Sequence, residues 1–162
     1  KEYFVSLRKT NEVSLEPIAT STTAVNTKVE YRNNRYGFSV DLPQSWRGFT
    51  IVEDIWEGYA PSDTTGQELI ATGPLIFIRH PQWTEKNQRQ DIPVMVFTTK
   101  EWDDVQADKF HIGAAPIGPS EIGRNSKYVF TLPARYNFAF PTGFEEVEQI
   151  LEGKPLTTFN VQ

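Results

Sequence analysis

Side chains that can act as an acid, a base or a nucleophile are few in this sequence, and they are scattered. The two histidines, His80 and His111, stand in no His-x-x-x-His or Glu-x-x-His pattern, so a zinc site is disfavoured. The chain has no cysteine and no Gly-x-Ser-x-Gly motif, which excludes a cysteine nucleophile and argues against a serine hydrolase of the usual kind. The sequence therefore predicts no metal site, no cofactor and no recognisable catalytic triad.

Acidic and glycine-rich clusters also lack the spacing of known sites. Acidic residues gather at 103–108 and 145–148, but the first cluster lacks the glycine and terminal glutamate of a calcium-binding loop. We interpret both as solvated helix faces. The segment 112–119 lacks the Gly-Lys-Ser/Thr of a phosphate-binding loop, and its prolines remove amide donors, so a rigid loop is expected there.

Loop residues rich in arginine and aromatic side chains are the best candidates for a binding surface. Arginine, tryptophan and tyrosine are enriched in interface hot spots, and functional loops often follow a buried strand as the polar segment 79–91 does. The candidate binding residues are Arg79, His80, Trp83, Arg89, Asp91, Arg124, Arg135 and Tyr136. In the alternative interpretation the arginines bond to loop carbonyls and Trp83 covers an edge of the core.

An enzyme is the alternative hypothesis for function. It would be a hydrolase that uses His80 and Asp91, or carboxylates that converge from distant strands, because sequence spacing does not report the separation of about 5–10 Å that glycoside hydrolysis needs. A concave pocket shared by His80, Asp91 and another acid would favour catalysis. Scattered positions would favour binding.

The composition limits the class of protein. A chain of 162 residues with 38% hydrophobic and 13% aromatic residues has the size and apolar content of one folded domain. Its net charge of −5 disfavours nucleic acid as a partner, and no apolar stretch approaches the roughly 20 residues of a membrane helix. The sequence begins at Lys1 rather than Met, which leaves room for a removed leader or an upstream anchor, so an extracytoplasmic location in the cell envelope is expected.

The pattern of apolar residues predicts a series of strands. Residues 1–30 are predicted to be an N-terminal extension and linker, with an edge strand or tether at 2–7, and residues 31–162 a single domain. Strands are expected at 36–42, 49–55, 75–78 and 94–98, the first two antiparallel to each other, with a loop at 59–67. An aromatic hairpin is expected from 128–132 and 136–140, joined by a turn at 132–135.

Two helices are predicted from their start signals. Thr98 with Glu101 and Thr142 with Glu145 fit the capping box, and an apolar stripe follows each. Gly153 is expected just past the end of the second helix, which should dock on the sheet. Because the strands cluster rather than alternate with helices, we predict an α+β fold, an antiparallel β-sheet with helices packed on it.

The run from Tyr36 to Trp46 (YGFSVDLPQSW) resembles the opening strand and turn of the PsbP/Mog1 superfamily, in which an aromatic-Gly-Phe strand leads into Leu-Pro and a tryptophan. The resemblance implies a PsbP/Mog1-like α+β sandwich. Members generally act as binding or assembly modules, including extrinsic photosystem subunits, a Ran-binding protein and bacterial lipoproteins. The chain shows no photosystem-specific or Ran-specific determinants, and the anchoring cysteine of a lipoprotein is absent.

The leading hypothesis is therefore a non-enzymatic binding or assembly module, exported and tethered by its N-terminus. Its partner is a protein or a small ligand that the sequence does not identify. A third possibility is a structural subunit whose residues 1–30 pair with a neighbour as an added strand.

Overall fold

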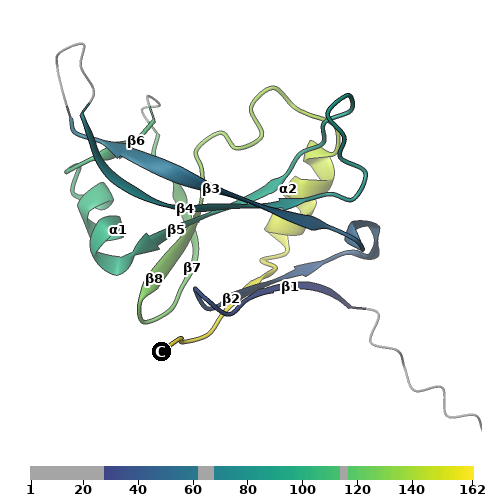
Figure 1. Cartoon of the computed structure of the whole chain (residues 1–162), viewed down its shortest axis with the longest axis horizontal. Helices are drawn as coiled ribbons and strands as arrows, with labels where there is room; N and C mark the ends of the chain where they lie inside the picture. Colours follow the sequence, from purple (N-terminus) through teal and green to yellow (C-terminus); the bar gives the residue numbers. More distant parts are fainter. Residues whose placement is uncertain (1–27, 62–67, 114–116) are drawn as a thin grey trace, which may run out of the picture.

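The computed structural model describes residues 28–61, 68–113 and 117–162, which form a mostly antiparallel β protein with two short helices (Figure 1). In chain order the elements are β1 (Val29–Asn33), β2 (Phe38–Leu42), the 3-10 turn η1 (Gln44–Trp46), β3 (Thr50–Tyr59), β4 (Leu69–Arg79), β5 (Ile92–Thr98), α1 (Thr99–Gln106), β6 (His111–Ile112), β7 (Ser120–Arg124), β8 (Tyr128–Leu132), α2 (Phe144–Glu152) and β9 (Leu156–Thr158). The expected strand at 2–7 and parts of the loops at 59–67 and 112–119 lie outside the described residues. Neither helix in the described part of the chain is long and apolar enough to cross a membrane.

The strands form two antiparallel sheets. One has the order β1-β2-β9, and the other, a curled half-barrel, has the order β6-β3-β4-β5-β8-β7 (Figure 1). The predicted pairing of 36–42 with 49–55 is wrong, because β2 pairs with β1 and β9, whereas β3 pairs with β4 and β6. The short helical turn η1 and the positive φ of Gly48 carry the chain out of the small sheet before β3 begins.

Strand β5 shows that the large sheet has a buried face on each side. Ile92, Val94 and Val96 point into a core shared with the small sheet and α2. Met95 and Phe97 point the opposite way, as the two-residue period of a strand requires, into a second core under α1. The predicted strands at 75–78 and 94–98 are confirmed as parts of β4 and β5.

The predicted hairpin is wrong in its second strand. Strand β8 pairs with β5 and β7, and residues 136–140 form turns rather than a strand. Positive φ angles at Arg135, Ala139 and Phe140 are incompatible with an extended strand, and Pro133 has no amide hydrogen for a ladder. Residues 133–143 instead arch beside the sheet, and this arch becomes one wall of the candidate site.

The two predicted capping boxes have different outcomes. At α1 the box is confirmed, because Glu101 N donates to Thr98 Oγ1 at 3.1 Å and Thr98 N donates to Glu101 Oε2 at 3.1 Å. At α2 the box at Thr142 is wrong: the N-cap is Gly143, at φ 82°, with no side-chain cap. The predicted docking of α2 on the sheet is confirmed by Val147, which is fully buried in the first core.

Candidate functional site

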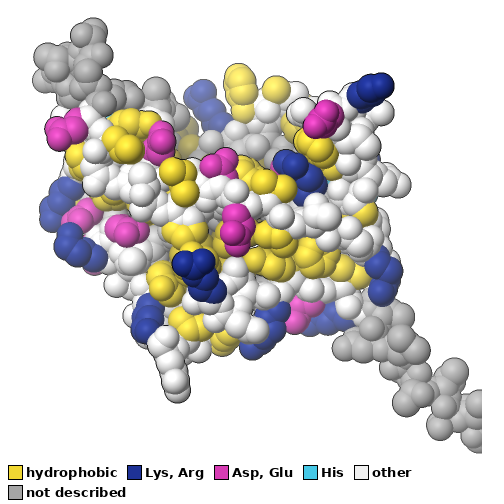
Figure 2. Space-filling model, in the orientation of Figure 1, with side chains coloured by type: hydrophobic (Ala, Val, Ile, Leu, Met, Phe, Trp, Pro, Cys, Tyr) yellow, Lys and Arg dark blue, Asp and Glu magenta, His cyan; other side chains and the backbone are white. Residues whose placement is uncertain are grey.

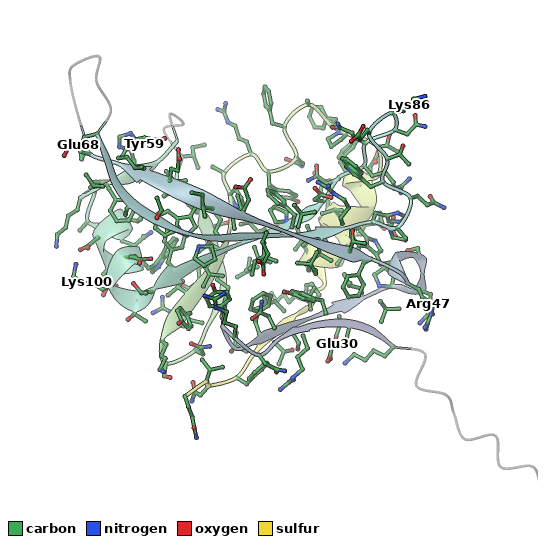
Figure 3. The ribbon with its side chains drawn as sticks, viewed as in Figure 1. Glu30, Arg47, Tyr59, Glu68, Lys86 and Lys100 are labelled. Carbon is green, nitrogen blue, oxygen red and sulfur yellow. The ribbon has the colours of Figure 1, made fainter. Side chains whose placement is uncertain are left out.

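A groove lies on the half of the large sheet that α1 leaves uncovered. Its floor is made by Leu75, Phe77 and Pro93, which alternate with the first-core residues of β4 and β5 and therefore face away from the small sheet. One wall is the β4–β5 loop, whose tip is marked by Lys86 in Figure 3, and the other is formed by residues 133–141 of the arch. The cavity between them has a volume of about 590 Å³.

Most of the predicted binding residues meet in this groove, although they come from two segments far apart in the chain. The lining includes Arg79, Trp83, Arg89, Asp91, Arg135 and Tyr136. His80 and Arg124 lie elsewhere. The sequence thus identified most of the charged and aromatic side chains of the groove, while the fold places them around one hollow.

Arg79 and Asp91 form a fixed ion pair on the groove floor. Arg79 Nε and Nη2 donate to the two carboxylate oxygens of Asp91 at 3.1 and 2.9 Å, and the guanidinium carbon lies 3.8 Å from the centre of the Trp83 ring. The hydrogen bonds to Asp91 raise the pKa of Arg79. The pair neutralises its own charge, so its main effect is to hold the Trp83 indole in place.

The neighbouring residues tie the two walls together. Gln90 is only 6% exposed, and its Nε2 donates to Asp91 O at 2.8 Å and to Tyr136 O at 3.2 Å. Its backbone N donates to Thr142 O at 2.8 Å, next to the bridge between Arg89 and Thr142. These bonds join the β4–β5 loop to both ends of the arch, so the groove is preformed.

Two polar atoms of this wall are left without partners among the described residues. They are Gln90 Oε1 and Arg89 Nε, both buried. The Arg89 guanidinium has Glu146 as its nearest acid, with Nη2 and Oε2 at a long 3.7 Å, and the same Glu146 accepts a hydrogen bond from Ser45. The charge of Arg89 is therefore only partly compensated within the protein.

The outer lip of the groove is exposed and apolar, with one cation. Arg135 is exposed, and no hydrogen bond or ion pair of its side chain is found in the described part of the chain. Phe138, which also lines the groove, is 76% exposed, and Phe140, whose ring packs on Phe144, is 69% exposed. An exposed phenylalanine next to an arginine without an ion pair among the described residues is typical of a surface that a partner covers.

His80 lies on the other side of the sheet from Asp91's ion pair. It is 4% exposed, its ring meets Trp46 edge to face at 5.0 Å, and its Nδ1 accepts a hydrogen bond from Gln82 N at 3.0 Å. Burial, and then the charge of Arg89, lowers the pKa of His80, so the imidazole is held neutral with its proton on Nε2. His80, Asp91 and a second acid therefore do not share a pocket.

Arg124 belongs to a separate surface on β7. Its Nη2 donates to Glu121 Oε2 at 2.9 Å, and both residues line a different cavity together with Leu151 and Leu156. Within the described residues, no group of three histidine or acidic side chains is placed to hold a metal ion.

No protein-family model, curated protein or solved structure matches the chain.

Sequence reasoning missed several lining residues. Gln90 carried no signal, because a buried glutamine that bridges two loops looks like any polar loop residue. Leu75 and Phe77 belonged to a predicted strand, but nothing in the sequence indicated that α1 would cover only part of their face. Phe138 was seen only as a member of the hairpin that does not form.

Proposed function

We propose that this protein is a non-enzymatic binding module whose recognition surface is the groove between residues 79–91 and 133–141. One observation carries the proposal: two distant chain segments, joined through Gln90, enclose an apolar sheet surface and surround it with arginine and aromatic side chains. Apolar concave sites with a few convergent polar groups are the usual form of binding sites.

The position of His80 supports binding over hydrolysis. A general base has to reach its substrate, whereas the His80 imidazole packs against Trp46 beneath the protein surface. Asp91, the acid proposed to act with it, already has both carboxylate oxygens bonded to Arg79. Neither residue is placed to handle a proton of a ligand in the groove.

The resemblance to the PsbP/Mog1 superfamily supports the same class of function. The residues that carry it form β2 and then the η1 turn, which buries Trp46. We further propose a PsbP/Mog1-like sandwich tethered in the cell envelope, on this resemblance alone. Fractionation of the source cells tests the location: recovery of the full-length protein in the cytosol would contradict it.

Capture from a native extract tests the binding function. Immobilised wild type is compared with the double variant Trp83→Ala, Arg135→Ala, and with Arg124→Ala as a matched control on a separate surface. We expect a partner that wild type and the control retain and the double variant loses. A partner retained equally by all three proteins, or no specific partner, would contradict the proposed groove.

The fluorescence of Trp83 also provides a direct measure of ligand binding in the groove. The other tryptophans, Trp46, Trp56 and Trp102, are 1%, 2% and 6% exposed, whereas Trp83 is partly exposed in the groove. Acrylamide quenching of tryptophan fluorescence should therefore come mainly from Trp83, and a ligand in the groove should reduce it. Quenching that is unchanged when a captured partner is added would place the partner elsewhere.

A further inference from the structure

We propose that the groove binds an extended, acidic and apolar segment of a protein partner, with its carboxylates at Arg89 and Arg135. This inference rests on the proposed binding function and adds the chemistry of the ligand.

The charge of the groove is opposite to that of the whole chain. The chain carries a net charge of −5, yet the groove is lined by Arg79, Arg89 and Arg135 and by one acid, Asp91. Asp91 compensates Arg79 through two hydrogen bonds. Arg89 keeps a long ion pair of 3.7 Å with Glu146, and Arg135 has none among the described residues. Part of the Arg89 charge and the charge of Arg135 are therefore left to attract an anion.

These two arginines lie on opposite walls. Arg89 comes from the β4–β5 loop, and its guanidinium packs against the base of the arch, since a Cβ on Gly143 would lie 3.0 Å from Nη2. Arg135 lies on the arch itself, beside the exposed Phe138. A guanidinium presents its donors in a planar fork that fits a carboxylate, so the pair favours a ligand with more than one acidic group.

The hollow extends beyond the arginines. Leu75 and Pro133 also line a second cavity of about 510 Å³, which continues across the sheet to β3 and β6. This second part is lined by Asp54 and Glu57 and by no lysine or arginine. The charge therefore changes from positive to negative along a continuous apolar floor, which fits a segment with acids at one end, apolar residues in the middle and a basic residue at the other.

A protein segment fits these features better than a membrane or a nucleic acid. Anionic lipid surfaces are bound by clusters of about four to eight basic residues, and phosphate backbones by many lysines and arginines. The face shown in Figure 2 has hydrophobic side chains interrupted by single acidic and basic groups and no extended basic patch. Arg135 has no ion pair among the described residues, and Glu146 compensates Arg89 only in part. Two such arginines in a chain of net charge −5 suit a short acidic sequence instead.

Selection from a displayed library of random peptides of about twelve residues tests the proposal. Peptides are selected on the full chain, and their binding is measured by anisotropy and by protection of Trp83 from acrylamide. We expect enrichment of acidic residues next to leucine or aromatic residues, and binding that weakens at least about fivefold in Arg135→Glu. Lys86→Glu is the matched control, because Lys86 lies at the exposed tip of the same loop outside the groove lining (Figure 3), and it should have little effect.

The other outcomes separate this inference from the proposed function. Selected peptides that protect Trp83 but carry no acidic residues would overturn the ligand class and leave the binding function standing. Arg135-dependent binding to phosphatidylserine vesicles, with no peptide enriched, would overturn it in favour of a membrane surface. If no probe protects Trp83 and no captured partner depends on the groove, both proposals fail.

Discussion

Thr131, in the middle of β8, makes a sharp test of how the second core is packed. Its side chain is fully buried, and its hydroxyl has no hydrogen-bond partner among the described residues. It lies between Met95 of β5 and Glu121 of β7, on the same face of the sheet as Val129. A buried hydroxyl without a partner costs about 1–3 kcal/mol relative to a bonded one.

Valine places a methyl group where threonine has its hydroxyl and keeps the branched shape that strands favour. Thr131→Val should therefore raise the free energy of unfolding by about 1 kcal/mol, and Tm by about 2–4 °C for a domain of this size. Thr131→Ser keeps the hydroxyl and removes a buried methyl group, so it should lower the free energy of unfolding by about 1 kcal/mol.

Urea unfolding followed by tryptophan fluorescence and far-ultraviolet circular dichroism measures these differences. Thr72→Val, the same change at an exposed position of β4, is the matched control and should stay within about 0.5 kcal/mol of wild type. If Thr131→Val instead destabilises the protein by about 1 kcal/mol or more, the hydroxyl is hydrogen-bonded in solution and the reasoning is refuted.

Three further predictions concern a cap, a buried imidazole and a close contact. Thr98→Ala should cost about 1 kcal/mol and Thr142→Ala almost nothing in urea unfolding, because only the first threonine caps a helix; equal effects would contradict the assignment. Burial lowers the pKa of His80, so the unfolded chain takes up the proton first as the pH falls. The free energy of unfolding should therefore decline below about pH 6.5, and His80→Gln should flatten that decline; an unchanged slope would show that other groups cause it. Gly73→Ala should cost about 1–3 kcal/mol and alter the near-ultraviolet dichroism, since a Cβ there would overlap the buried ring of Trp56; in a Trp56→Phe background the cost should shrink.

The sequence by itself determined the local structure wherever neighbouring residues carry the signal. Alternation in β2 and β8 predicted strands, because side chains of a strand point in turn to opposite faces. The capping box at Thr98 works within one turn of backbone, so its residues suffice to predict the start of α1. Residue type also picked out most of the charged and aromatic side chains that line the groove.

The sequence was a poorer guide where the same residues are compatible with more than one backbone conformation. The pattern at Thr142 matches that at Thr98, yet at the second site a left-handed Gly143 begins the helix. Thr142 O instead accepts a hydrogen bond from Gln90, from a loop far away in the sequence. The strand predicted from the aromatic alternation of 136–140 is wrong for the same reason, because the positive φ angles of the arch depend on how the arch is held against the sheet.

Only the tertiary structure decided which strands pair and where the hollow lies. Alternation shows that a strand has two faces, but it does not say which neighbour completes its hydrogen bonds, so the pairing of β2 with β9 had no local signal. The groove exists because α1 covers part of one sheet face and the arch stands beside the rest. The groove is positive because its one acid, Asp91, is bonded to Arg79 and to neither of the other two arginines. That pairing depends on distances between side chains, which the linear sequence does not contain.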